Sequence, residues 1–334
     1  MNPINIAIIG CGAVAERGHI PAIINNPNAN ISVLVDKNLP RAQKIASKFD
    51  ISNIEDDFSK IMDDVDAAII ALPHFLHAPV SIEFLKNGIH VLIEKPMALN
   101  TAECDEMIRA ADEGDAILMV GLMRRFLPSH VFVKYAMDKE LIGKIKSFDI
   151  QEGNVYNWPV ASDFFFKKDK AGGGVLMDTG AHTIDSMLWW LGEVKKFQYF
   201  DDNFGGVEAD CHIDLTMESG AIGTVELSRT RNLRNTAIIE GEKGIIEVHL
   251  RQNMASIYLK EDDIGLSGNC YSNTTSSLSQ YQFTDLFRYQ LDNWISAIKR
   301  EQKPIVTPEK ARLSISFIES CYLNRKNIEL PWLK

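Results

Sequence analysis

"IAIIGCGAVAERGHIPAI", residues 6–23, is the stretch that decides the fold of this chain. An apolar run ends at Gly10, and Gly10, Gly12 and Ala15 match the G-x-G-x-x-G/A spacing just before a segment of helical spacing. Gly10 permits a tight turn, Gly12 lets the backbone approach a pyrophosphate, and the small Ala15 lets helix and strand lie close together. The stretch predicts a dinucleotide-binding turn between a strand and a helix.

The segments that follow decide whether this turn is more than an ordinary glycine-rich loop, which the spacing alone leaves open. Segments of helical spacing separate five apolar, strand-like runs: "INIAIIG", "ISVLVD", "DAAIIALP", "IHVLIEK" and "AILMV". Strands that are apolar on both faces, with helices between them, predict a parallel sheet covered on both sides. We expect a doubly wound α/β domain, the Rossmann arrangement, over residues 1–123.

The pattern changes after "VGLMRRFLP". A helical segment that begins after "AGGG" is followed by runs that partly alternate between apolar and polar residues: "KKFQYF", "CHIDLTM", "AIGTVELS", "TAIIEG", "GIIEVHL" and "ASIYLK". Turns such as "ESG" and "GEKG" separate several of them, which predicts a large, mostly antiparallel sheet. We expect a second, α+β domain over residues 124–334, with an open-faced sheet, for substrate binding and oligomerisation.

The composition excludes several classes of function. The 334 residues carry a formal net charge of −10 and their 35 Lys and Arg are scattered, so we expect no nucleic-acid partner. No apolar run reaches the roughly 18 residues of a membrane helix. An export signal requires Lys or Arg before its apolar run, and none precedes the first run here, so we expect no export signal. Five widely spaced cysteines without a CxxC pair indicate neither a disulfide framework nor a zinc site, which favours the cytoplasm.

The second strand-like run, "ISVLVD", ends in Asp36, whose carboxylate suits the adenosine ribose of a dinucleotide. An acidic side chain here accepts hydrogen bonds from both ribose hydroxyls and repels a 2′-phosphate, which favours NAD over NADP. The alternative is a helix N-cap or a solvated loop aspartate. Lys37 and Arg41 are cations that would neutralise a phosphate, so NADP is not excluded.

The run "IHVLIEKP" ends in Glu94, Lys95 and Pro96, at the carboxyl edge where open α/β sheets bind ligands. Proline after Lys95 ends the strand and fixes the local backbone, which would direct the ammonium group into the crevice. The alternative is an exposed Glu-Lys pair without a function, because such pairs are common at strand ends.

"AGGGVLMDTGAHTIDSMLWWL", residues 171–191, is an apolar segment of helical spacing with three ionisable side chains from Val175 onward. At about 100° per residue, Asp178, His182 and Asp185 fall within a wedge of about 60°. Two carboxylates and an imidazole in one line indicate a catalytic site. The alternative is a buried helix whose polar groups only bind neighbouring loops.

The glycine motif, the strand-end "EKP" and "GGGVLMDTGAHTID", in that order, resemble the Gfo/Idh/MocA family, named for glucose-fructose oxidoreductase, inositol dehydrogenase and a rhizopine-catabolism protein. The resemblance spans essentially the whole chain, including "VGLMRRFLP" and "IIEGEKGIIEV". It implies the two domains described above and NAD(P)-dependent oxidoreduction, usually of a sugar or cyclitol hydroxyl. It also implies that open sheets pair face to face in a homodimer or homotetramer, and we expect an apolar open face to favour that pairing.

The resemblance also assigns roles. Lys95 matches the family's active-site lysine, Asp178 and His182 match its "GG…D…H" pair, and Asp185 matches a frequent aspartate. Because oxidation of an alcohol needs a base for the hydroxyl proton, we expect His182 to be that base, Asp178 to orient its ring or bind a substrate hydroxyl, and Lys95 to bind the reacting oxygen. Asp185 would bind substrate or support His182, and Trp158 would stack on a sugar ring or pack in the core.

The cofactor side of the site shows one departure from the family, since Leu72-Pro73-His74 replaces its usual Thr-Pro-Asn. We therefore assign no cofactor contact to the side chain of His74, whereas His77 matches the family's histidine beside the cofactor. The two histidines form H-x-x-H, but no third ligand follows at recognisable spacing, and we expect no metal. The residues that we expect around the cofactor are Gly10, Gly12, Ala13, Val14, Ala15, Asp36, Leu72, Pro73, His77, Glu94 and Lys95.

The expected function is hydride transfer between NAD(P) and a secondary hydroxyl or ketone of a sugar, cyclitol or nucleotide sugar. Two alternatives share the fold: a glycosidase that recycles bound NAD, and a non-catalytic regulator that binds dinucleotide. Net turnover of added NAD separates a dehydrogenase from the glycosidase. The presence of Lys95, Asp178 and His182 together argues against a regulator.

Overall fold

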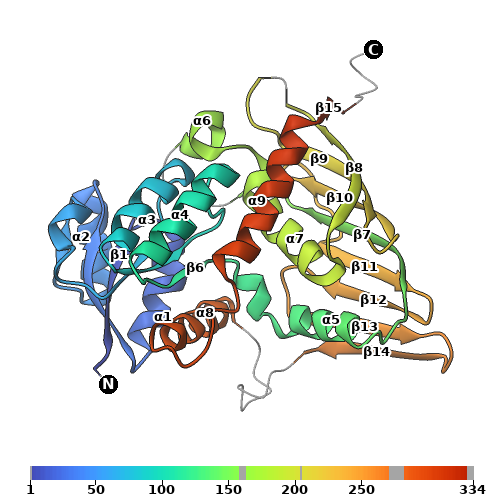
Figure 1. Ribbon diagram of the computed structural model, residues 1–334, viewed down its shortest axis with the longest axis horizontal. Helices are drawn as coiled ribbons and strands as arrows, with labels where there is room; N and C mark the ends of the chain where they lie inside the picture. The colour runs from blue at the N-terminus through green and yellow to red at the C-terminus, as the bar shows by residue number, and fades with distance from the viewer. Residues whose placement is uncertain (1, 158–162, 204, 271–281, 329–334) are drawn as a thin grey trace.

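The computed structural model describes residues 2–157, 163–203, 205–270 and 282–328. These residues form two sheets, with helices around the first and between the two (Figure 1). Among them, no helix combines the length and the apolar character needed to cross a membrane.

The first sheet contains six parallel strands in the order β3-β2-β1-β4-β5-β6. They are β1 (Ile4–Ile9), β2 (Ala29–Val35), β3 (Ile54–Glu55), β4 (Ala67–Ile70), β5 (His90–Ile93) and β6 (Leu118–Val120). Every residue of β4 and all but one of β1 are buried, as expected for strands covered on both faces. The chain order reverses between β1 and β4, which opens a crevice at their carboxyl ends. The predicted doubly wound Rossmann domain is confirmed.

Helices connect these strands and cover the sheet. A π-helix, η1 (Ala15–His19), runs directly into α1 (Ile20–Ile24) after the glycine turn. The remaining helical connections are α2 (Leu39–Phe49), η2 (Phe58–Ile61), η3 (His74–Leu76), α3 (His77–Lys86) and α4 (Thr101–Glu113). Asn38 and Asn100 accept hydrogen bonds from backbone N–H groups in the first turns of α2 and α4, which explains where these two helices begin.

The second sheet contains nine strands in the order β14-β13-β12-β11-β7-β10-β9-β8-β15. They are β7 (Ile145–Gly153), β8 (Val194–Asp201), β9 (Asp210–Met217), β10 (Ile222–Ser228), β11 (Thr236–Gly241), β12 (Gly244–His249), β13 (Met254–Leu259), β14 (Ile264–Asn269) and β15 (Arg325–Asn327). The pairs β7–β10 and β8–β15 are parallel and the other pairs antiparallel, which confirms the predicted sheet. The sequence pattern did not predict β7, β14 or β15.

Helices pack on one face of the second sheet and contact the first domain (Figure 1). α7 (Val175–Leu191) packs against β9 and β10 and against both α5 (Pro128–Asp138) and α9 (Pro308–Leu323). α9 also packs against α4 and β6, and α8 (Phe283–Ile298) packs against α1 and η1. Three short helices complete the described chain: η4 (Met123–Phe126), η5 (Asp163–Phe166) and α6 (Lys168–Ala171).

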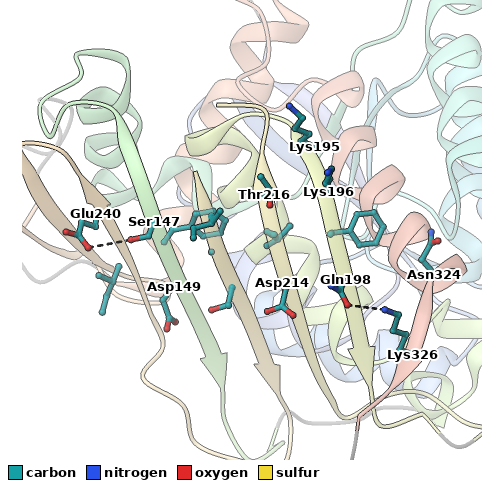
Figure 2. Close-up of a pocket in the computed structure, with 17 residues that line it drawn as sticks. Ser147, Asp149, Lys195, Lys196, Gln198, Asp214, Thr216, Glu240, Asn324 and Lys326 are labelled. Atoms are coloured by element: carbon teal, nitrogen blue, oxygen red, sulfur yellow. Dashed lines mark hydrogen bonds between the residues drawn. The ribbon is translucent and has the colours of Figure 1, made fainter. Parts of the chain in front are cut away.

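The other face of the second sheet is open, and Figure 2 shows that polar side chains dominate it. Along β9, Leu215 is buried beneath the helices, whereas Asp214 and Thr216 lie on the open face. Asp149 on β7 and Gln198 on β8 lie on the same face, which lines a hollow of about 1030 Å³. The expectation of an apolar open face is therefore wrong, because alternation along each strand turns the polar residues outward.

Candidate active site

A cleft of about 1080 Å³ follows the carboxyl edge of the first sheet and separates it from α7. Its walls come from the turns after β1, β2, β4 and β5, from the start of α7, and from the ends of β7, β10 and β12. Most of the predicted site lines this cleft: Gly10, Gly12, Ala13, Val14, Asp36, Leu72, Pro73, Glu94, Lys95, Asp178 and His182.

The turn after β1 fits the pyrophosphate of a dinucleotide. Gly10 has φ of +99°, and a Cβ there would lie 2.4 Å from the Ala71 carbonyl oxygen, so only glycine is compatible. A Cβ on Gly12 would meet no atom within 4 Å, because that position borders the cleft. Ala15 is fully buried and does not reach the cleft. A phosphate can therefore approach the backbone N–H groups where the helix begins.

Asp36 stands at the carboxyl end of β2 with its carboxylate already anchored to the backbone. Oδ2 accepts from the Cys11 N–H at 3.0 Å, and Oδ1 accepts from the Asn38 N–H at 2.8 Å. A carboxylate oxygen accepts about two hydrogen bonds, so Oδ1 keeps capacity for a ribose hydroxyl. Arg41 Nη1 lies 3.4 Å from Oδ2 and places a cation beside the ribose position.

The turn after β4 places its two histidines differently from expectation. His77 is fully buried, with Nδ1 2.7 Å from the Pro96 carbonyl oxygen and Nε2 2.9 Å from that of Leu72, so it joins two turns and does not line the cleft. His74 does line the cleft, and its Nδ1 lies 2.9 Å from the Ala171 carbonyl oxygen. Burial lowers the pKa of His74 to about 3, so its ring is neutral.

Glu94 links the cofactor turn to the EKP turn. Its Oε1 lies 2.7 Å from His19 Nε2, and its Oε2 accepts from the Lys95 N–H at 3.2 Å. Burial acts to raise the pKa of Glu94, but the hydrogen bond from His19 and the nearby Lys95 charge outweigh it, so the pKa lies below its ordinary value. The carboxylate is ionised and held by two neighbours.

Lys95, Asp178 and Arg229 form an ion-paired group in the cleft. Lys95 Nζ donates to Asp178 Oδ1 at 2.6 Å, and Arg229 Nη2 donates to Oδ2 at 2.8 Å. Burial acts to raise the pKa of Asp178, and the two cations outweigh it and hold the pKa well below its usual range. Asp178 thus binds two cations, and within the described residues it makes no hydrogen bond to the His182 ring that it was expected to orient.

The glycines before α7 explain why the helix begins beside the cleft. The Glu208 carboxylate accepts from the Gly174 N–H at 2.9 Å and the Leu176 N–H at 3.0 Å, which satisfies two free donors of the first turn. A Cβ on Gly174 would lie 1.8 Å from the Glu208 carbonyl oxygen, and one on Gly173 would lie 1.9 Å from the Tyr322 hydroxyl. The glycines therefore let the helix start approach a buried carboxylate.

His182 lies one helical turn after Asp178 and lines the same cleft. Its Nδ1 is buried and makes no hydrogen bond within the described part of the chain. Burial, followed by the charges of Arg124 and Lys95, lowers the pKa of His182 well below its ordinary value. The ring is therefore neutral near pH 7, the form that can accept a proton.

Asp185 does not reach the cleft, which differs from the expectation that it binds substrate. Arg125 donates to its two oxygens at 2.9 and 2.7 Å, and both side chains are nearly fully buried. This ion pair ties η4 to α7 behind the cleft. Trp158 lies outside the described residues.

Comparison with known proteins places the chain in a family. Residues 4–122 match a family model described as "Oxidoreductase family, NAD-binding Rossmann fold", and residues 130–247 match the "GFO/IDH/MocA C-terminal domain". The chain belongs to the GFO/IDH/MocA oxidoreductases. The resemblance inferred from the sequence is confirmed, as is the expectation of an NAD-binding Rossmann domain.

Individual relatives span most of the chain. The scyllo-inositol 2-dehydrogenase (NAD(+)) of Bacillus subtilis strain 168 is 26% identical over 330 residues, 93% of this chain and 91% of that protein. The 4-carboxy-2-hydroxymuconate-6-semialdehyde dehydrogenase of a Sphingobium species is 29% identical over 236 residues, 67% and 71% of the two chains. A levoglucosan dehydrogenase solved with NADH and levoglucosan has a TM-score of 0.86 at 20% identity, with 97% of each chain covered, and so shows the same GFO/IDH/MocA fold.

Four charged residues that line the cleft of this GFO/IDH/MocA chain with Asp178 and His182 were missed by sequence reasoning: Arg124, Glu152, Arg229 and Arg251. Arg124 lies in the "VGLMRRFLP" motif, and the arginine-rich "SRTRNLR" follows β10, so these two left a signal in the sequence. Glu152 and Arg251 left none. Within the described ranges, no group of three or more His, Cys, Asp or Glu residues could hold a metal.

Proposed function

We propose that this chain is an NAD-dependent dehydrogenase or reductase of a secondary hydroxyl or ketone on a sugar, cyclitol or nucleotide sugar. The neutral His182 ring carries the proposal, because it shares the cleft with the Lys95–Asp178 ion pair at the edge of a dinucleotide-binding sheet. Relatives named as inositol dehydrogenases and as a dTDP-sugar 3-reductase support the substrate class.

The side chains divide the work of the reaction. His182 takes the hydroxyl proton during oxidation and returns it during reduction. Lys95 binds the reacting oxygen and favours its negative charge, while Asp178, supported by Arg229, holds the ammonium group in place. NAD, when bound along Gly10 to Val14 and Asp36, supplies the hydride acceptor.

A screen for NADH formation from NAD tests the proposal. The substrates are neutral and acidic sugars, inositols and nucleotide sugars, each with NAD and with NADP. We expect NADH from at least one of them, with NAD preferred. Cleavage of a nitrophenyl glycoside without net NADH would instead identify a glycosidase that recycles its cofactor, and NAD binding without any turnover would favour a regulator.

We also propose that the chain forms a homodimer or homotetramer through the open face of the second sheet. Lys196 and Lys326 lie on that face with Asp149, Asp214 and Glu240, so both signs of charge are available for pairing with a second copy (Figure 2). Sedimentation at micromolar concentration should show a species heavier than the 37.5 kDa chain, and a single 37.5 kDa species would contradict it.

A reducing cytoplasm suits the five cysteines, which are free thiols.

A further inference from the structure

A second group of charges lies at the end of the cleft next to His182, formed by Arg124, Glu152 and Arg251. Arg124 donates from Nη1 and Nη2 to the two Glu152 oxygens at 2.8 and 2.5 Å, and Arg251 Nε donates to Oε1 at 2.7 Å. Thr183 Oγ1 donates to Oε2 at 2.6 Å. The carboxylate is fully buried and its acceptor sites are occupied by the protein, so Glu152 acts on the two guanidinium groups and not on a ligand.

This end of the cleft carries an excess of positive charge. Arg124 and Arg251 share one carboxylate, and so do Lys95 and Arg229 in the neighbouring group. Glu94, adjacent to Lys95 and hydrogen-bonded to His19, reduces the excess of these four cations over carboxylates from two charges to one. This local positive excess contrasts with the net charge of −10 of the whole chain and favours an anion in the cleft.

Arg251 is the exposed cation of this group and lines the cleft. Its side chain is 38% exposed and lines the cleft, whereas Arg124 is almost fully buried. Its Nε is fixed by Glu152, and Asn154, in the amide orientation that suits its neighbours, accepts from Nη1 at 3.3 Å. Within the described residues Nη2 has no acceptor. A guanidinium group fixed at its inner edge and open at its outer edge is preorganised for an anionic oxygen.

We infer that the substrate carries a carboxylate or a phosphate group, which Arg251 binds at the end of the cleft next to His182. The inference rests on the proposed dehydrogenase function and names its substrate class: an acidic derivative of a sugar or cyclitol, not the neutral compound. The edge of either group matches the guanidinium fork, and its charge offsets the excess of cations. Glu152 is a positioning residue that holds Arg251 in place.

Isothermal titration calorimetry of the full chain saturated with NADH tests the inference. The probes are matched sets that differ only in the anionic group: D-glucose with D-glucuronate and glucose 6-phosphate, and D-galactose with D-galacturonate. We expect an anionic member of at least one set to bind about ten- to a hundredfold more tightly than its neutral partner, the range for hydrogen bonds to a charged group. The uronate and phosphate arms identify which anion is preferred.

Variants assign the preference to Arg251. Arg251→Gln should abolish it, and Arg251→Lys should restore part of it, because lysine keeps the charge without the fork. Arg300→Gln is the matched control, since Arg300 is 66% exposed, pairs with Asp115 and does not line the cleft. If Arg251→Gln no longer binds NADH and has therefore lost its fold, the wild-type preference and Arg251→Lys decide the question.

The outcomes that overturn the inference are distinct from those that overturn the proposed function. Equal or tighter binding of every neutral probe, no binding of any anionic probe, or a preference that survives unchanged in Arg251→Gln would each remove the anion site. Tight binding of an anion that yields no NADH when NAD is supplied would support the anion site and contradict the dehydrogenase.

Discussion

The two ends of the cleft are built in different ways. The cofactor end consists of a glycine turn after β1 and an aspartate at the end of β2, which lie close together in sequence. The substrate end consists of charged side chains that meet across long stretches of chain: 83 residues separate Lys95 from Asp178, and 99 separate Glu152 from Arg251. A local motif reveals the first end, whereas the contacts that join the charged side chains of the second end form only in the folded chain.

The largest expected effect separates turnover from cofactor binding. His182→Ala and Lys95→Ala should each lower kcat by about a hundredfold or more, the range for positioned acid–base groups. His182→Ala should bind NAD normally, because the ring belongs to the substrate end. Asp178→Asn should also impair turnover, since it removes the charge that holds Lys95. Steady-state kinetics and NAD titration on the same samples measure both quantities.

Near-normal turnover by His182→Ala would remove the ring from the mechanism. Loss of the folded state, detected by circular dichroism, would instead show that the polar residues of α7 serve the fold.

A substitution of Asp36 should weaken NAD binding and leave turnover intact, the opposite of the result expected for His182→Ala. Asp36→Ala should weaken NAD binding about ten- to a hundredfold, because hydrogen bonds to a charged group are worth about 1.5 to 3 kcal/mol, and should leave kcat at saturating NAD near normal. Asp64→Ala, a change at an exposed aspartate outside the cleft, is the control. Titration with both cofactors checks the result, and tighter binding of NADP by the unaltered chain would contradict the role of Asp36.

The same contrast explains which strands the sequence predicted. The strands of the first sheet are apolar runs, and those runs predicted all of them except the two-residue β3. β7, at the centre of the second sheet, was missed because Glu152 occupies an inward position where alternation favours an apolar side chain. The folded chain brings Arg124 and Arg251 to the buried Glu152 carboxylate, and these ion pairs offset the cost of burying its charge.

For the candidate site, the sequence pattern indicated which helix carries the charged residues but not which partner each of them meets. Asp178 and Asp185 look alike on the helix, seven residues apart and on one side. The fold gives Asp178 a place in the cleft beside Lys95 and gives Asp185 a buried partner in Arg125. Which cation a helical carboxylate meets depends on distant segments, so the local pattern could not distinguish the two.

A third prediction concerns the helix start at the substrate end. Glu208→Gln should lower the free energy of unfolding by about 1 to 3 kcal/mol, because an amide accepts at only one of its two positions and leaves an N–H of α7 unpaired. Tyr322→Phe removes only the hydroxyl bonded to Glu208 and should cost less. Urea unfolding measures both, and equal losses would show that the helix cap contributes nothing beyond the hydroxyl contact.

The smallest expected effect is the pH dependence. Burial and two nearby cations lower the pKa of His182, so the neutral base persists below the ordinary histidine value of about 6.5. The acid limb of kcat/KM should therefore lie below about pH 6.5, with little change between about pH 6.5 and 8. The residual activity of His182→Ala provides the control profile. An acid limb of kcat/KM at or above pH 6.5 in the wild type that is absent from the His182→Ala profile would show that His182 titrates there, which would contradict a neutral buried ring.

Helix α9 contacts α4 and β6 of the first domain as well as α7 and β8 of the second. During synthesis both sheets, apart from the edge strand β15, leave the ribosome before this helix does. A nascent chain can therefore form both sheets while α9, a part of the interface between the two domains, is still missing. We expect the distance from the glycine turn to Asp178 and His182 to become fixed only after α9 has emerged from the ribosome.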